Sequence, residues 1–137
     1  MPDNDRSHLI AEWLKYAEDD ELNARAILKD RDGTPAQICF LSQQMAEKYF
    51  KALLLHFTGD YPRIHDIREL AVTLDRYEKA VKTELEGDII FLTPFYVGTR
   101  SPADIPLERF TGGSAAQAFA ATLRIKEFVL EGLKGSV

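Results

Sequence analysis

The sequence predicts an all-α protein, an antiparallel up-and-down bundle of four to five helices. Apolar residues recur at spacings of three and four along most of the chain, and the alternation that is typical of strands is absent. Helix start and stop signals divide the chain into segments. With 137 residues the chain is long enough for one helical domain, 1–137, in which we expect residues 1–6 and 134–137 to be loosely held.

The segment from Thr34 to Phe57 predicts a long central helix. Thr34 and Pro35 are typical of a helix start, and Gln37 stands where it would complete a capping box. No glycine or proline follows until Gly59. Apolar residues lie on nearly every side of this segment, which indicates helical neighbours in several directions. This surface exceeds what one bundle core would cover, so we expect a homodimer.

Four further helices are predicted around it. The first begins near Ser7 and ends before Gly33, the third is short and runs from Ile67 to Leu74, and the fourth runs from the early 80s to Leu92. The last follows a second predicted capping box, Ser114 with Gln117. The glycine- and proline-containing stretch 95–113 predicts a long connection, and such connections are often functional.

An acidic run, 18–21, lies within the first predicted helix. Such a run is typical of a solvated helix face. Asp20 and Glu21 nevertheless fall near the apolar stripe, so we expect one of them to face inward and to require a partner.

Composition and motifs argue against several classes of protein and of functional site. The formal net charge of −5 argues against binding nucleic acid through bulk positive charge. The single cysteine, Cys39, is expected to be a buried small residue in a reducing compartment, and the absence of a long apolar run or a signal peptide predicts a cytoplasmic protein without membrane contact. Zinc spacing, Glu-x-x-His pairs and a P-loop are absent from the sequence, so we predict no metal, no cofactor and no catalytic residue.

Five side chains of the central segment form what we call the polar ridge: Gln43, Gln44, Glu47, Lys48 and Lys51. One interpretation is a solvated ridge in which Glu47 and Lys51 form an i,i+4 pair worth about 0.2–0.5 kcal/mol. The other is a surface that meets a nucleotide or a second protein. Large apolar neighbours and two adjacent glutamines, with their donors and acceptors, favour binding.

Three more residues are candidates for nucleotide or partner binding. Arg100 lies in the long connection, where a guanidinium can hold a phosphate or a structural carboxylate. His65 lies in a polar turn, and with Asp66 it is either a helix entry or an acid/base pair. Tyr96 is expected to be a buried ring with a partner for its hydroxyl group.

These residues carry a resemblance to a known family. Four pieces occur in order: 13–24 (Trp13, Tyr16-Ala17, Glu21 to Ala24), 38–54 (with Gln43 to Lys48), His65-Asp66-Ile67, and Tyr96-x-x-x-Arg100 followed by Pro102 and Asp104. The chain resembles the HEPN domains, the higher-eukaryote and prokaryote nucleotide-binding domains, from about Leu9 to Leu133. It departs from them at Glu21, where Asp is usual, and at Ser101, where a second Tyr is usual.

The resemblance implies a helical bundle that homodimerises and, in bacteria, often acts with a minimal nucleotidyltransferase in a toxin–antitoxin-like pair. Many HEPN proteins are also metal-independent ribonucleases with an Arg four to six residues before a His. No such pair exists here, because Arg6 and Arg63 stand too close to His8 and His65. The resemblance therefore favours a non-catalytic nucleotide- or RNA-binding and partner-binding module. The alternatives are a ribonuclease with a degenerate site built on Arg100 and His65, and a dimerisation scaffold without a ligand.

Overall fold

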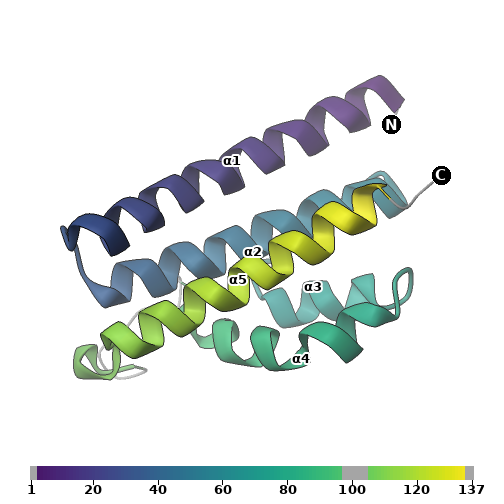
Figure 1. Ribbon diagram of the computed structural model, residues 1–137. Coiled ribbons are helices and arrows are strands. Elements are labelled where there is room, and N and C mark those ends of the chain that lie inside the picture. The colour runs from purple at the N-terminus through teal and green to yellow at the C-terminus, as the bar shows by residue number, and fades with distance from the viewer. Residues whose placement is uncertain (1–2, 97–104, 135–137) are drawn as a thin grey trace.

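The computed structural model describes residues 3–96 and 105–134, which form five α-helices (Figure 1). In chain order these are α1 (Asp3–Asp30), α2 (Pro35–Thr58), α3 (Ile67–Leu74), α4 (Ala80–Leu92) and α5 (Gly112–Lys134). Among the described residues between α4 and α5 lie two short 3-10 turns, η1 (Thr93–Phe95) and η3 (Leu107–Arg109). The predicted all-α bundle is confirmed, although α1 begins ahead of the expected Ser7.

The central position of α2 determines the architecture. Helices α1, α5 and α3 all pack against it, and α4 packs against α5 and α3 (Figure 1). Both apolar sides of α2 are therefore buried within one chain, including Phe40, Leu54 and Leu55. This burial corrects the reason for expecting a dimer, because α2 leaves no apolar face for a second copy.

Local capping signals set two of the helix starts. The hydroxyl oxygen of Thr34 accepts a hydrogen bond from the backbone N–H of Gln37 at 3.2 Å. The carboxylate of Asp66 accepts one from the N–H of Arg68 at 2.9 Å and caps α3, which supports the helix-entry interpretation of this turn. At the other end of α2, Gly59 takes a left-handed φ of 78°, a conformation that glycine adopts without strain.

The start of α5 differs from the prediction. The hydroxyl group of Thr111 accepts from the N–H of Ser114 at 3.0 Å, and Ser114 Oγ accepts from the N–H of Thr111 at 2.8 Å. The reciprocal cap is therefore Thr111 with Ser114 rather than Ser114 with Gln117. Its position places both glycines, Gly112 and Gly113, inside the first turn.

The acidic run of α1 is partly solvated and partly internal. Asp20 is buried and pairs with Lys48 on α2, while Glu21 binds Lys126 on α5 at 2.7 Å and Arg25 at 2.9 Å. Burial alone would raise the pKa of Glu21, but the hydrogen bonds from Lys126 and Arg25 outweigh it and hold the pKa below its ordinary value. The expected inward-facing carboxylate is confirmed, and the run links α1 to both neighbouring helices.

Candidate functional site

The turn between α2 and α3 brings His65 back beside the middle of α2. After Gly59 the chain runs without helical structure to Asp66. Extended chain advances about 3.3 Å per residue and a helix about 1.5 Å, so these few residues span several turns of α2. His65 thereby reaches Glu47 and Gln43, which precede it by 18 and 22 residues.

Glu47 lies at the centre of the site. Its Oε2 atom is 3.0 Å from Lys51 Nζ and 2.9 Å from His65 Nδ1. Glu47 is 8% exposed and Lys51 is 3% exposed, so the i,i+4 pair predicted from the sequence exists but is not solvated. A carboxylate in such surroundings requires a partner, and the Lys51 ammonium group supplies it.

Lys51 also contacts α1. Its Nζ atom lies 5.4 Å from the centre of the Trp13 ring, a distance typical of a cation–π contact. The Trp13 ring in turn packs edge-on against Tyr61, with 5.1 Å between centroids. Lys51 is therefore enclosed between the Glu47 carboxylate and the face of the Trp13 ring, and it stabilises the carboxylate that contacts His65.

Gln43 fixes the backbone of the turn. The side chain is fully buried, and its Nε2 atom donates a hydrogen bond to the carbonyl oxygen of His65 at 3.0 Å. Together with Glu47, it holds His65 at two points, the main chain and the ring. The Oε1 atom of Gln43 has no hydrogen-bond partner in the described part of the chain.

The face of the His65 ring is paired with Tyr96, which follows η1. The two rings are nearly parallel, with 9° between their planes and 5.2 Å between their centroids. The side chain of His65 remains 52% exposed. Its second ring nitrogen, Nε2, has no hydrogen-bond partner among the described residues. The site thus presents a half-exposed aromatic pair with a free polar atom on the His65 ring.

Lys48, another residue of the polar ridge, faces α1. Lys48 pairs with Asp20 and lies 5.8 Å from the centre of the Tyr16 ring, and Gln44 is half-buried. Burial raises the pKa of Asp20 above its ordinary value, although the hydrogen bond from Lys48 opposes this. Within the polar ridge, Gln43 and Glu47 therefore contact His65 directly, and Lys51 is linked to it through Glu47. Arg100 lies outside the described residues.

Sequence reasoning does not assign Trp13 or Tyr61 to the site. In the sequence, Trp13 is only one of the residues that carry the family resemblance, and its proximity to Lys51 depends on how α1 packs against α2. No signal in the sequence specifies this contact. The Cys39 thiol is buried, and burial raises its pKa to about 11, so thiolate is scarce at neutral pH and a nucleophilic role is disfavoured.

Neither a metal cluster nor a membrane-spanning helix is found in the described part of the chain. Within residues 3–96 and 105–134, no group of three or more His, Cys, Asp or Glu side chains could hold a metal ion. None of the described helices combines the length and apolar character that crossing a membrane requires.

The protein is a helical bundle in which two buried polar side chains of the central helix, Gln43 and Glu47, hydrogen-bond His65 in the turn before α3. The family model of the HEPN domain matches residues 10–133. The chain therefore belongs to the HEPN family.

Two solved structures are similar over nearly the whole fold. One is TT1696 from Thermus thermophilus, with 29% sequence identity, a TM-score of 0.78, and coverage of 90% of this chain and 98% of that one. The other is ST0689, an archaeal HEPN homologue, with 29% identity, a TM-score of 0.72, and coverage of 90% and 97%. No curated protein matches this chain.

Proposed function

We propose that this HEPN protein is a cytoplasmic, non-catalytic module that binds a nucleotide or short RNA and also binds a protein partner. The observation that carries the proposal is the half-exposed His65 ring, stacked on Tyr96 and held at Nδ1 by Glu47. Unpaired bases are recognised by stacking on aromatic side chains and by hydrogen bonds to their edges. His65 offers both an aromatic ring and a free ring nitrogen.

The charge of the surrounding groups is compatible with this ligand. A bare carboxylate would repel a phosphate, but the ammonium group of Lys51 neutralises Glu47 from the interior. Because Lys51 and Lys48 are already paired, we assign the phosphate contact to Arg100, by analogy with the position of the family's Tyr-x-x-x-Arg segment. The affinity that results is expected to be modest and sensitive to salt.

A second candidate function is metal-independent cleavage of RNA. The specific observation in its favour is the pairing of Glu47 with His65, because a carboxylate at Nδ1 orients an imidazole for proton transfer at Nε2. The absence of an Arg four to six residues before any His speaks against it. We therefore place binding first.

Replacing His65 by Ala should weaken binding of a short labelled RNA by about 1–3 kcal/mol, the range measured for one stacked base. Tyr96→Ala should act in the same direction, and Arg100→Ala should flatten the salt dependence by about one unit. Binding is measured by fluorescence anisotropy at low salt, with His8→Ala, an exposed histidine on α1, as the matched control.

The same samples, incubated in chelator and resolved on a gel, separate the candidate functions. Intact RNA with measurable binding supports the proposal. Cleavage that disappears in both His65→Ala and Arg100→Ala would establish the ribonuclease instead. If the protein neither binds nor cleaves the RNA, the dimerisation scaffold is the alternative that remains.

The protein partners that we propose are a second copy of this chain and a nucleotidyltransferase, as in toxin–antitoxin-like pairs of the family. A groove of about 360 Å³ between α3 and α4 supports self-association. Val72 and Ile90 stand exposed along it, and Arg68 and Glu86 supply both signs of charge at its edges. A patch that carries both signs can be complementary to itself in a two-fold interface.

Light scattering at micromolar concentration should give the mass of a dimer. Val72→Asp combined with Ile90→Asp should shift the protein to monomer, because two apolar contacts would be replaced by carboxylates that lose their hydration in the interface. Leu22→Asp, which alters an exposed leucine on α1, is the matched control and should leave the mass unchanged. A monomeric wild-type protein would contradict the proposal.

A further inference from the structure

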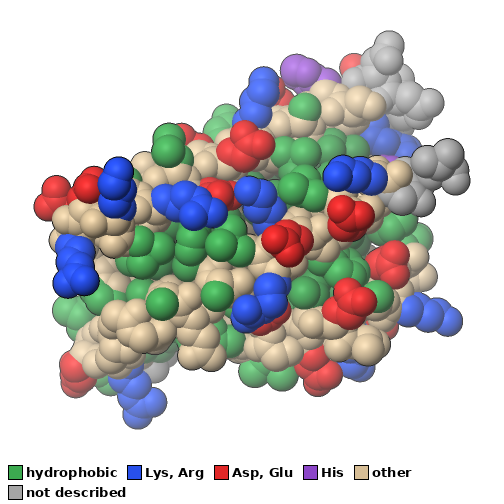
Figure 2. All heavy atoms as spheres, viewed as in Figure 1, with side chains coloured by type: hydrophobic (Ala, Val, Ile, Leu, Met, Phe, Trp, Pro, Cys, Tyr) green, Lys and Arg blue, Asp and Glu red, His purple; other side chains and the backbone are tan. Residues whose placement is uncertain are grey.

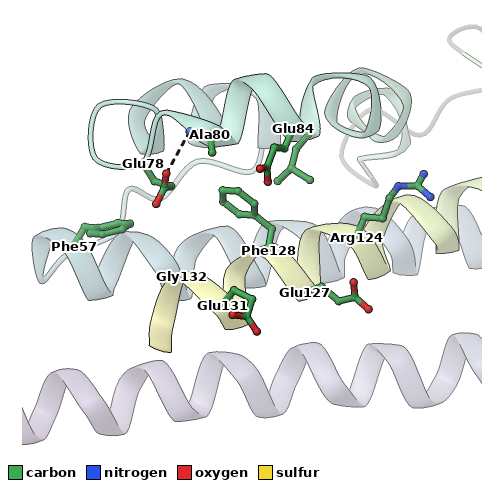
Figure 3. A pocket seen from close by; sticks show the side chains of 10 residues that line it. Phe57, Glu78, Ala80, Glu84, Arg124, Glu127, Phe128, Glu131 and Gly132 are labelled. Atoms are coloured by element: carbon green, nitrogen blue, oxygen red, sulfur yellow. Dashed lines mark hydrogen bonds between the residues drawn. The ribbon is translucent and has the colours of Figure 1, made fainter. Parts of the chain in front are cut away.

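A cleft of about 530 Å³ lies between α4 and α5 and shares no residue with the His65 site. Figure 3 shows the Phe128 ring standing between the two helices, with Glu84 beside it on α4 and Phe57 at the end of α2. The volume lies within the range of protein pockets that accept ligands or side chains.

The floor of the cleft is apolar and partly aromatic. Phe57, Leu85 and Phe128 line it, and Gly132 on α5 contributes no side chain. Tyr77, which is half-exposed, extends this surface because its ring stacks on Phe57 with 5.9 Å between centroids and 12° between planes. Exposed aromatic faces attract both apolar groups and cations.

Four carboxylates surround this floor, and little positive charge offsets them. They are Glu78, Glu84, Glu127 and Glu131. The one cation of the lining, Arg124, is engaged by Asp88 through three hydrogen bonds of 2.8–3.1 Å. Acidic side chains also face the viewer along α4 and the C-terminal half of α5 in Figure 2.

The individual carboxylates have few partners. Glu84 and Glu127 form no ion pair within the described residues, and Glu131 has only the exposed Lys134 at 3.8 Å. One oxygen of Glu78 accepts from the N–H of Ala80 at 3.3 Å. An aromatic floor with uncompensated negative charge at its edges is complementary to a ligand that is both cationic and apolar.

We infer that this cleft binds a basic, amphipathic segment of a partner protein, with arginine at the carboxylates and apolar side chains on the aromatic floor. Nucleic acid is excluded here by the sign of the charge. A guanidinium group can stack on a phenylalanine ring while it hydrogen-bonds a glutamate, and the cleft offers both side by side. The inference rests on the partner-binding half of the proposed function and is independent of nucleotide binding.

The test measures anisotropy of a short labelled peptide that carries arginines on one helical face and leucines on the other. The wild-type protein should bind it at low salt, and Glu78→Gln combined with Glu84→Gln should weaken binding roughly tenfold through two lost ion pairs. Glutamine at 78 keeps an acceptor for the Ala80 N–H. Glu18→Gln combined with Glu69→Gln, on α1 and on α3 outside the cleft, is the matched control and should bind as wild type does.

Peptide variants separate this inference from its alternatives. Replacing the leucines by serine should also reduce binding, because the aromatic floor then loses its contacts. Equal binding by both double variants would overturn the inference in favour of general charge attraction, and equal affinity for spermidine would overturn it in favour of a small organic cation. No binding at about 1 mM peptide, equivalent to about −4 kcal/mol, would overturn it outright. Short-RNA binding by the Glu78/Glu84 variant should persist, so failure here and failure at His65 are distinguishable.

Discussion

Replacing Lys51 by Ala should lower the free energy of unfolding by about 3–5 kcal/mol, the range for breaking a buried ion pair. Lys51 is 3% exposed, and its ammonium group is the cationic partner of the Glu47 carboxylate. Without it, a buried negative charge would retain only His65 Nδ1, and the Trp13 ring would lose a packing neighbour. Urea unfolding followed by circular dichroism measures the change.

A double variant tests the cause of this loss. Lys51→Met combined with Glu47→Gln removes both charges and keeps similar volumes, so it should recover most of the stability. Lys15→Ala, which removes an exposed lysine on α1, is the control for the loss of a cation and should be nearly neutral. If Lys51→Ala alone were as stable as the wild-type protein, the Glu47–Lys51 ion pair would be exposed to water. Its description as a buried pair that stabilises the His65 site would then be wrong.

Truncation of Met45 to Ala should cost about 2–5 kcal/mol. Met45 is fully buried on α2 and belongs to the main core cluster. The loss combines the transfer of apolar atoms from water with the cavity that remains, and its size depends on how far the neighbouring helices can close the gap.

The melting temperature of Met45→Ala should fall by several degrees, since about 1 kcal/mol corresponds to roughly 2–8 °C in domains of this size class. Leu22→Ala removes a comparable amount of apolar side chain from an exposed position on α1 and serves as the control. An unchanged melting temperature in Met45→Ala would place this side of α2 on the outside of the bundle.

Most of the fold is accessible from the sequence because its determinants are local. Thr34 caps the helix whose start it predicts, and the burial of Met45 follows from the helical period alone. The error at α5 has the same local origin, because Thr111, which the prediction passes over, also has a hydroxyl group that can cap a helix and stands three residues before Ser114. Choosing between them depends on whether Gly112 and Gly113 enter the helix, and glycine specifies this weakly.

The candidate site is only partly predictable. The Glu47–Lys51 pair follows from helix geometry, but its burial depends on Trp13 from another helix. The contact between Glu47 and His65 depends on the path of a turn, and no periodic pattern encodes that path. Contacts between residues distant in the chain form only once the helices have packed. A single sequence can therefore identify candidate residues but cannot predict which of them contact one another.

The double attachment of His65 to α2 has a consequence for binding energetics. The backbone of the turn is held by Gln43 and the ring by Glu47, so the orientation of the imidazole is already set when the chain folds. A flexible histidine would lose rotamer and backbone freedom on meeting a ligand, which subtracts from affinity. In this protein that entropy is lost during folding, and the His65 ring is preorganised for whatever stacks on it.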